Sequence, residues 1–546
     1  MIHYFDLLTQ TMKRDWDKKA VCNWHGDEYT FKDVAERIEK LHVFFEKAGI
    51  GKAQKVALCA PNSAHWAISF LAINTYETVV VPLLADFTPE AVGNLVDHSE
   101  SVLLFTNAET WNKIDKKAMP RLRGAVNVAD FSLLWAEDDV KAAFEGMDAA
   151  YAAKHPSGLT RDDVNYPHDN WKDLAVINYT SGTTSAPKGV MLRYECFCAS
   201  IDFAIRKIPA DNSCNIVSML PMGHIYGLVF EFLYPLCSGV TVYYLGKAPS
   251  ATTLLKAVAE VKPYLIITVP LVMEKVYKSS IKPVLSKPAM KVLCAIPGIN
   301  SILYGVIRKK LLTAFGGEVQ EFIMGGAALN PEVENAFRKI KLPYTVGYGM
   351  TEAAPLLAYA HPWNYVKGTC GEKVDSAEVR IASDDPENVP GEIQAKGANI
   401  CSGYFNNPEA SENAFTEDGF LRTGDLGTMD KAGNITIRGR IKNMILSANG
   451  QNIYPEEVEA VVNNQDYVVE SVVVSRGAKL VALVYLDKDA IGKAGLSEES
   501  IHDIPDNIRV NANKVLPSYS QIVSVEVVPE PFEKTPKMSI KRFLYK

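Results

Sequence analysis

Short runs rich in Val, Ile and Tyr alternate with longer stretches of helical period through much of the chain, and this alternation is the strongest constraint on its fold. The stretch from Phe31 to Gly49 places apolar residues at i, i+3 and i+4 spacings, which is typical of an amphipathic helix. A strand-like run KVALCAP follows from Lys55, then a helical stretch AHWAISFLAINTY from Ala64 and a strand-like run TVVVPLL from Thr78. Two consecutive strand–helix units predict a doubly wound α/β sheet.

The C-terminal part of the sequence has a different pattern. After about residue 370, the alternating runs AEVRIAS, GEIQAKG and NITIRGR are separated by Gly-rich turns, as in an antiparallel sheet. Beyond Arg440 the sequence predicts a compact α+β unit, with a helix that starts at Pro455 and a hairpin formed by VESVVVSR and KLVALVYLD. We therefore predict an α/β protein whose large N-terminal domain, residues 1–440, holds doubly wound sheets and a small antiparallel subdomain. A small C-terminal domain takes residues 441–546.

The composition favours a soluble enzyme and argues against several other classes of protein. The 546 residues are 47% apolar and 22% charged, which permits a large buried core and is unlike a disordered chain. A formal net charge of -7 argues against a broad surface for a polyanion such as DNA. The nine cysteines are scattered without C-x-x-C pairs, which argues against a zinc site or a disulfide framework. We see no apolar leader or long apolar span, so we expect a cytoplasmic protein.

The stretch LAVINYTSGTTSAPKGV, residues 174–190, is the most informative about function. An apolar run opens into a loop rich in Thr, Ser and Gly, whose backbone N–H groups and hydroxyls can converge on phosphate oxygens, and Lys188 adds a positive charge. It is not a Walker A loop, because Pro187 precedes the lysine and Gly189 follows it. The predicted phosphate-binding residues are Thr180, Ser181, Gly182, Thr183, Thr184 and Lys188.

The string YTSGTTSAPKGV resembles the phosphate-loop motif of the adenylate-forming superfamily, which includes acyl- and aryl-CoA synthetases, luciferases and adenylation domains. Ser185 stands where a glycine is common in that motif. Further motifs follow in the family's order: LPMGHIYG, GGAAL, GYGMTEAAP, LRTGDLG and GRIKNMILSANGQNIYPEEVE. VKPYLIITVPLVMEKVYKS and GYFNNPEAS are similar to the long-chain acyl-CoA synthetase branch. The resemblance covers almost the full length and implies a mobile C-terminal domain.

The resemblance implies a role for each motif of the large domain. His224 and Gly325 would line the acyl site, and Gly326 and Ala327 the adenine and acyl pocket. In GYGMTEAAP, Tyr348 would stack on adenine beside Gly349, Thr351 would hydrogen-bond the α-phosphate and Glu352 would hold Mg²⁺. A carboxylate is a suitable ligand, because Mg²⁺ that bridges phosphates prefers hard oxygen donors. A lone histidine such as His224 is otherwise more often a core residue.

The motifs around the domain boundary imply a nucleotide contact and a hinge. Asp425 would accept both ribose hydroxyls, and Arg440 would contact the ribose and phosphate. Lys442 would be the pivot residue, and Gly450 would lie in the loop that lines the pantetheine channel. The chain has Asn443 where the family usually carries an acidic residue.

The C-terminal tail departs from the family pattern. The family ends with a motif close to PKTxxGKIxR, whereas this chain ends PFEKTPKMSIKRFLYK, which places Ser539 at the position of the catalytic lysine. The loss of one preorganised contact of this kind typically costs about 10²–10³ in rate. Lys537 and Lys541 lie two residues to either side, and residues at i±2 of an extended segment point to the same face. We therefore expect one of them to substitute.

The resemblance implies that the enzyme activates a fatty acid, of long chain, with ATP and Mg²⁺. Acyl-AMP and pyrophosphate would form first, and CoA would then displace AMP to give acyl-CoA. Two alternatives stay open. One is an acyl-AMP or carrier-protein ligase of the same fold, and the other is an acyl-nucleotide binding protein that has lost turnover, which Ser539 alone supports.

The segment 281–315 is apolar, basic and interrupted by Pro and Gly. One interpretation is a partly buried pair of helices. The other is an acyl-channel gate or a surface that touches a membrane, since basic amphipathic helices lie on anionic lipid. The membrane interpretation would place a cytoplasmic enzyme peripherally at the inner face of the membrane.

Overall fold

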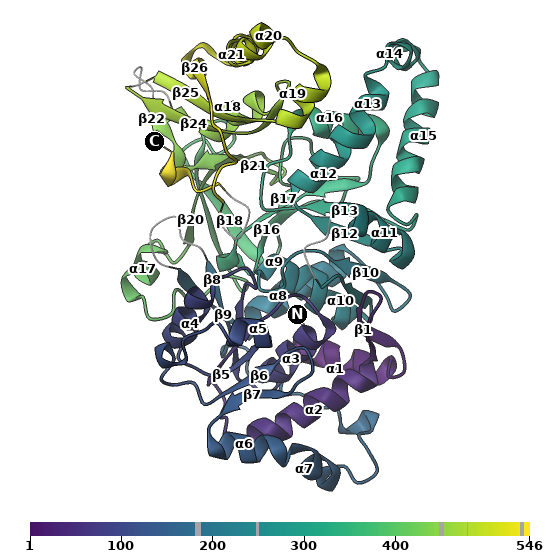
Figure 1. Ribbon diagram of the computed structural model, residues 1–546, viewed down its shortest axis with the longest axis vertical. Helices are drawn as coiled ribbons and strands as arrows, with labels where there is room; N and C mark the ends of the chain where they lie inside the picture. Colours follow the sequence, from purple (N-terminus) through teal and green to yellow (C-terminus); the bar gives the residue numbers. More distant parts are fainter. Residues whose placement is uncertain (181–186, 247–250, 447–451, 478, 535–539, 546) are drawn as a thin grey trace.

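Two large β-sheets with helices packed against them form the body of the molecule (Figure 1). The computed structural model describes residues 1–180, 187–246, 251–446, 452–477, 479–534 and 540–545. Within these residues, the first sheet has the strand order β7-β6-β5-β3-β4-β8-β9, and the second has the order β14-β13-β12-β10-β11-β1-β2.

The first sheet is parallel except at its two edges, where β7 and β9 run antiparallel to their neighbours. Its strands are β3 (Lys55–Cys59), β4 (Val79–Leu83), β5 (Ser101–Thr106), β6 (Gly124–Asn127), β7 (Leu133–Ala136), β8 (Leu174–Thr180) and β9 (Lys188–Arg193). The strands predicted from Lys55 and Thr78 are β3 and β4, and they pair in parallel.

The second sheet is parallel except for the antiparallel pair of β1 and β2. Its strands are β1 (Lys19–Asn23), β2 (Glu28–Thr30), β10 (Asn215–Ser218), β11 (Thr241–Tyr244), β12 (Leu265–Thr268), β13 (Glu321–Met324) and β14 (Tyr344–Val346). The N-terminal strands therefore complete a sheet whose other strands come from the middle of the chain.

The helices of the body connect these strands. They are α1 (Tyr4–Arg14), α2 (Phe31–Lys47), α3 (Ala64–Thr75), α4 (Pro89–His98), α5 (Ala108–Trp111), α6 (Asp138–Glu145), α7 (Met147–Lys154), α8 (Tyr194–Lys207), α9 (Ile225–Gly227), the π-helix η3 (Leu228–Leu233), α10 (Tyr234–Ser238), α11 (Ala251–Val261), α12 (Pro270–Val276) and α16 (Pro331–Ile340). Helix α2 is the one predicted from Phe31, and a capping box of Thr30 and Asp33 begins it.

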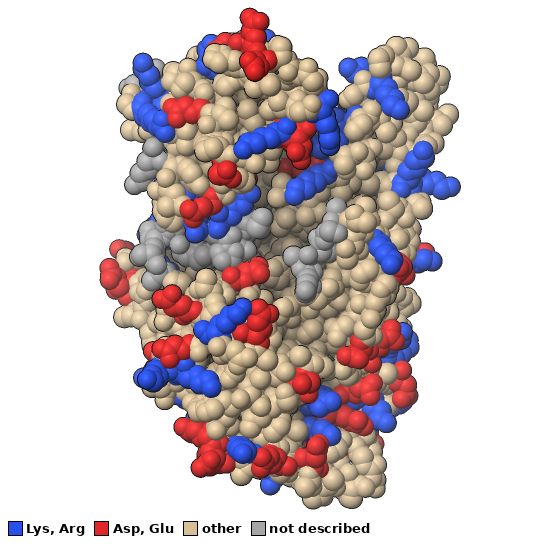
Figure 2. Space-filling view, in the orientation of Figure 1, with Lys and Arg blue, Asp and Glu red and all other residues tan. Residues whose placement is uncertain are grey.

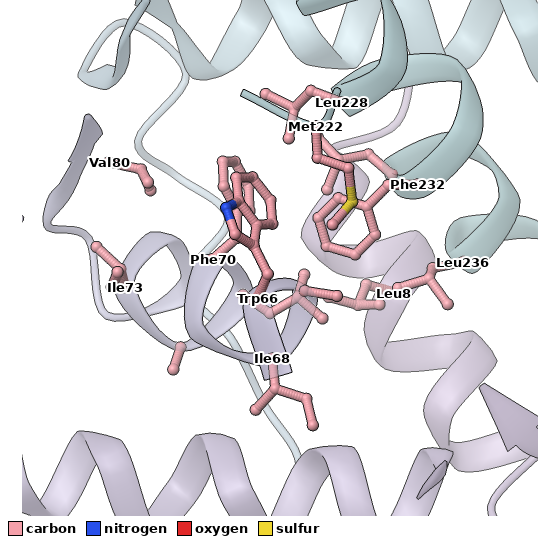
Figure 3. Close-up of a cluster of buried hydrophobic side chains, with 14 of the residues drawn as sticks. Leu8, Trp66, Ile68, Phe70, Ile73, Val80, Met222, Leu228, Phe232 and Leu236 are labelled. Atoms are coloured by element: carbon pink, nitrogen blue, oxygen red, sulfur yellow. The ribbon is translucent and has the colours of Figure 1, made fainter. Parts of the chain in front are cut away.

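Helix α3 lies between the two sheets, in contact with β3 and β4 of the first and β1 of the second. All its residues except His65 are buried, as expected for a helix that is apolar on every side. Trp66 stacks on Phe70 with ring centroids 5.6 Å apart, and both rings pack edge-on against Phe232 of η3 (Figure 3). The two sheets therefore share one hydrophobic core.

The C-terminal part forms smaller sheets, as predicted. An antiparallel sheet contains β18 (Ala377–Ala382), β19 (Gly391–Gly397), β20 (Leu421–Met429) and β21 (Ile435–Arg440), and a smaller one contains β15 (Tyr348–Gly349), β16 (Leu356–Tyr359) and β17 (Glu372–Lys373). The helix α17 (Pro408–Asn413) precedes β20. The last residues form β22 (Ile445–Leu446), β23 (Asn452–Ile453), α18 (Pro455–Val462), β24 (Val468–Arg476), β25 (Lys479–Leu486), α19 (Lys488–Ala494), α20 (Glu498–His502), α21 (Ile504–Asn513) and β26 (Ile522–Val527).

A separate helical projection stands beside the C-terminal sheets at the upper right of Figure 1. It contains the π-helix η4 (Tyr277–Ile281), α13 (Lys282–Leu285), α14 (Pro288–Ala295) and α15 (Ile299–Ala314). The segment 281–315 is helical and partly buried, as one interpretation predicted: Leu311 of α15 is buried and Tyr304 and Ile307 pack against the core, while α14 has no buried residue. Among the helices that the structure describes, none has the length and apolar character needed to cross a membrane.

Candidate active site

The turn that follows β10 crosses the carboxyl ends of strands in the first sheet. Asn62, which follows β3, donates to the carbonyl of Leu220 at 2.7 Å and accepts from a backbone N–H of the same turn. Asn178 of β8 donates to the carbonyl of Gly223 at 3.0 Å. Ligands of α/β sheets bind outside the carboxyl ends of the strands, so a substrate site is expected here.

A buried carboxyl group holds the same turn from inside the core. Oε2 of Glu231, a fully buried residue of η3, accepts from the Ser218 hydroxyl at 3.1 Å and from the backbone N–H groups of Met219 and Leu220 at 3.0 and 2.8 Å. Burial raises the pKa of Glu231 to about 8, although these three donors oppose the shift. Among the described residues, none hydrogen-bonds its Oε1. Glu231 thus fixes the turn that leads to His224.

The turn brings Tyr226 next to Gly325. His224 caps α9, and its Nδ1 accepts from the backbone N–H of Tyr226 at 3.3 Å. The ring of Tyr226 lies against Gly325, where a Cβ would stand 3.1 Å from the ring, and Gly326 and Ala327 follow. Two of the predicted acyl-site residues therefore meet Tyr226, His224 at its backbone N–H and Gly325 at its ring.

The motif GYGMTEAAP forms a tight loop between β14 and β16. Gly349 is required there, because a Cβ would stand 1.8 Å from the carbonyl oxygen of Pro355. The backbone N–H of Met350 donates to the same oxygen at 2.8 Å and closes the loop. The 3-10 turn η5 (Thr351–Ala353) follows, in which Thr351 is buried.

Glu352 and Lys188 both meet the side chain of Tyr404. The Tyr404 hydroxyl donates to Oε1 of Glu352 at 2.9 Å, and Nζ of Lys188 lies 4.7 Å from the centre of the Tyr404 ring. Burial and the charge of Glu352 raise the pKa of Tyr404. The backbone of residues 402–405 pairs with β9, which holds Tyr404 beside the phosphate-loop hairpin. The structure therefore unites the lysine and the carboxylate that the motifs predicted separately.

A second polar cluster joins Tyr348, Asp425 and Arg440. Asp425 and Arg440 are register partners in β20 and β21, and Arg440 Nε lies 3.0 Å from Asp425 Oδ1. The Tyr348 hydroxyl donates to Asp425 Oδ2 at 2.8 Å. Burial raises the pKa of Asp425, while Arg440 and Tyr348 favour its charged form. These three residues, predicted from three different motifs, form one connected group.

The predicted hinge begins directly after Arg440. Lys442 is exposed in the 3-10 turn η6 (Ile441–Asn443), and Asn443 donates to Glu456 of α18 at 2.6 Å. An aspartate at position 443 would place two carboxyl groups at hydrogen-bond distance, so the asparagine suits its partner here.

Of the two lysines predicted to replace the catalytic one, Lys541 lies within the described residues, and it is paired within the tail. Lys541 Nζ lies 3.3 Å from Oε2 of Glu533, and its backbone N–H donates to the Glu533 carbonyl at 2.8 Å. The next residue, Arg542, begins the 3-10 turn η8 (Arg542–Leu544) and forms an ion pair with Glu459 of α18. No hydrogen bond or ion pair between described residues joins Lys541 to Glu352, and the catalytic role of Lys541 stays a prediction.

Several predicted residues lie outside the described residues, and several contacts were not foreseen. The first group contains Ser181, Gly182, Thr183, Thr184, Ser185, Gly450, Lys537 and Ser539. Sequence reasoning missed Tyr404, although it stands inside the quoted motif GYFNNPEAS. It also missed Asn178, although this residue stands inside the quoted stretch 174–190, and it missed Asn62 and Glu231, which belong to none of the quoted motifs.

Comparison with protein families gives a match along most of the sequence. The model described as AMP-binding enzyme matches residues 8–405, and the model of the C-terminal domain of AMP-binding enzymes matches residues 442–545. The chain belongs to the AMP-binding enzyme family. The domain boundary between residues 440 and 441 stays a prediction.

Curated relatives of this AMP-binding enzyme are similar over nearly its whole length. A long-chain-fatty-acid–CoA ligase of Mycobacterium bovis is 27% identical over 560 residues, which cover 94% of this chain and 90% of the relative. Long-chain-fatty-acid–CoA ligase 5 of Rattus norvegicus is 26% identical over 569 residues, which cover 94% and 82%. The resemblance to the long-chain acyl-CoA synthetase branch is thus confirmed.

A solved structure has the same fold as this AMP-binding enzyme. The anthranilate CoA ligase AuaEII in complex with anthranoyl-AMP matches with a TM-score of 0.80 at 18% identity, covering 99% of this chain and 96% of that chain. The predicted fold class, an α/β body with a small antiparallel sheet and a C-terminal α+β unit, is therefore confirmed.

Substitution of Gly349 by Ala is expected to destabilise the enzyme by roughly 1–3 kcal/mol, because the new methyl group overlaps the Pro355 carbonyl. The melting temperature of the purified variant measures this effect. Gly51→Ala is the control, since a Cβ there meets nothing within 4 Å. Equal melting temperatures for the two variants would contradict the assigned contact.

Stability should depend on pH through Glu231. The folded pKa of about 8 lies above the ordinary value of 4.5, so between these pH values the folded protein keeps a proton that the unfolded chain has released. Stability therefore falls as pH rises through this window. The Glu231→Gln side chain cannot ionise, so the stability of this variant lacks the pH dependence due to Glu231. The melting temperature of the variant minus that of the wild type should therefore increase between about pH 5 and about pH 8. A difference in melting temperature between the variant and the wild type that stays constant over this pH range would contradict a buried, protonated Glu231.

Proposed function

We propose that the protein is an acid–thiol ligase that activates a fatty acid with ATP, through acyl-AMP, and transfers the acyl group to CoA. AMP and pyrophosphate are the other products, and the acid is of long chain. The main support is the geometry of two clusters, Lys188–Tyr404–Glu352 and Tyr348–Asp425–Arg440, which unite residues from separate motifs. The relatives named as long-chain-fatty-acid–CoA ligases support the choice of acid and acceptor.

The first cluster suits the phosphates of ATP. Lys188 offers a positive charge at the start of β9, where it is the register partner of Thr180 at the end of β8. The loop residues Ser181, Gly182, Thr183 and Thr184 would add hydroxyl and amide donors. Thr351, one residue before Glu352, is proposed to donate to the α-phosphate.

The second cluster suits the nucleoside. Asp425 is an acceptor for ribose hydroxyls, and its position is set by the strand partner Arg440 and by the hydroxyl of Tyr348. The hydrogen bond from this hydroxyl to Asp425 holds the Tyr348 ring beside the proposed ribose site, and the resemblance implies that the ring stacks on adenine. Gly349, Gly326 and Ala327 would leave room for the base.

The carboxylate of Glu352 fits Mg²⁺. Proteins usually bind this ion through one or two carboxylates together with the phosphates of the substrate, and Glu352 lies in the same cluster as Lys188. When bound with ATP, Mg²⁺ would neutralise charge on the phosphate oxygens. Tyr404 would orient the carboxylate through its hydrogen bond to Oε1.

Two substitution reactions follow at this site. An oxygen of the fatty acid carboxylate attacks the α-phosphorus, the new O–P bond forms, and pyrophosphate leaves. In the second reaction the CoA thiolate attacks the acyl carbonyl carbon, the C–S bond forms, and AMP leaves. We propose that the C-terminal domain turns about Lys442 between them, which would bring Gly450 to the pantetheine channel.

The acyl chain is proposed to lie beside His224 and Gly325. We further propose that the enzyme works in the cytoplasm and contacts the inner face of the membrane, since long-chain acids partition into lipid.

The proposal is tested by pyrophosphate release with oleate, ATP and Mg²⁺, with and without CoA. We expect release and the formation of oleoyl-CoA. Release with acyl-AMP retained would instead indicate an acyl-AMP or carrier-protein ligase. No release, together with binding of ATP or acyl-AMP, would indicate a binding protein without turnover, which Ser539 favours.

The lysines of the tail are tested separately. If Lys537 or Lys541 replaces the missing catalytic lysine, its substitution by Ala should slow acyl-AMP formation by about 10²–10³. Lys479→Ala, at an exposed position of β25, is the control and should leave the rate unchanged. Equal rates for Lys537→Ala, Lys541→Ala and the control would exclude the replacement.

A further inference from the structure

The pair α14 and α15, residues 288–314 and here called the hairpin, is a projection that is attached to the body at its base. Lys282 lies 3.3 Å from Glu332 of α16, and the Tyr277 hydroxyl donates to the same carboxylate at 2.8 Å. Leu311 belongs to the core, and Ile307 and Tyr304 pack against it at helical spacing. One face of α15 is therefore attached to the body.

The opposite face of the hairpin is apolar and exposed. Ile302 and Val306, one turn apart on α15, are 69% and 49% exposed, and Val292 of α14 is 65% exposed. Further exposed apolar residues of the hairpin are Leu293, Ile296 and Ile299. Single exposed apolar residues are common, but a cluster of six on one projection indicates a binding surface.

The charge of this region has one sign only. Residues 275–317 contain eight Lys or Arg and no Asp or Glu, although the whole chain has a net charge of -7. These basic residues are Lys275, Lys278, Lys282, Lys287, Lys291, Arg308, Lys309 and Lys310. Figure 2 shows blue side chains on this projection at the upper right, while the rest of that face carries both red and blue side chains.

We propose that the hairpin docks on an anionic lipid bilayer. Its apolar side chains would enter the boundary of the acyl chains, and the long stems of the lysines would reach the phosphate groups. Each Lys or Arg close to an anionic surface adds about fivefold to the binding constant.

Charge complementarity favours a bilayer over a second copy of this chain. Two hairpins that met through their apolar faces would bring together two surfaces that each carry four positive charges, of Lys291, Arg308, Lys309 and Lys310, and no negative one. The purpose of the docking rests on the proposed function: a ligase docked on lipid takes its long-chain acid from the bilayer.

Flotation of the full-length protein with vesicles tests the docking. We expect the wild type to float with vesicles of phosphatidylglycerol and phosphatidylcholine, and to float poorly with phosphatidylcholine alone or at high salt. The double variant Ile302→Asp/Val306→Asp should lose at least about tenfold in bound fraction. Lys309→Glu/Lys310→Glu should lose a similar factor. Val515→Asp, at a position 68% exposed in the C-terminal part, is the matched control and should float like the wild type.

Two further measurements separate the possible failures. Pyrophosphate release with albumin-bound oleate and no vesicles should be equal in the wild type and the Ile302→Asp/Val306→Asp variant, which shows that the variant is folded. Absence of this activity in the wild type would refute the proposed function and leave the flotation result valid. A wild type that does not float with anionic vesicles refutes the docking. A hairpin variant that floats like the wild type also refutes the docking. The same holds for a hairpin variant whose only change is its oligomeric state, measured by light scattering.

Discussion

The turn between β10 and α9 has to cross the carboxyl ends of a different sheet, and its backbone polar groups need partners there. Asn62 and Asn178 of the first sheet and Glu231 of the core supply them. Because these partners fix the turn, Tyr226 comes to lie against Gly325, with its backbone N–H bonded to His224. The helix α3, shared by both sheets, keeps this crossing in place, since neither sheet can move without disturbing its packing.

The other half of the site depends on pairing between strands. The antiparallel register of β20 and β21 sets Arg440 opposite Asp425, and the Tyr348 hydroxyl completes the cluster. Arg440 also lies two residues before the proposed pivot Lys442, so the nucleotide cluster and the hinge are neighbours in the chain. A reaction in two steps with one site would benefit from this adjacency, because motion of the C-terminal part starts at a residue proposed to hold the nucleotide.

The departures from the family motifs have unequal physical explanations. Asn443 donates to Glu456, where an aspartate would face another carboxyl group. No contact of this kind explains why position 539 lacks a lysine. Lys541 pairs with Glu533 in the same tail, and Lys537 lies outside the described residues.

The sequence alone determined the α/β class, the strands from Lys55 and Thr78, and the residues whose roles the motifs imply, because hydrophobic period and short motifs are local properties. Tertiary structure decided which of those motifs meet: Lys188 reaches Glu352 through Tyr404, and Asp425 joins Tyr348. It also decided that Glu231 would be buried and that the hairpin would be exposed. Such facts depend on contacts between residues far apart in the chain, which a local pattern does not encode.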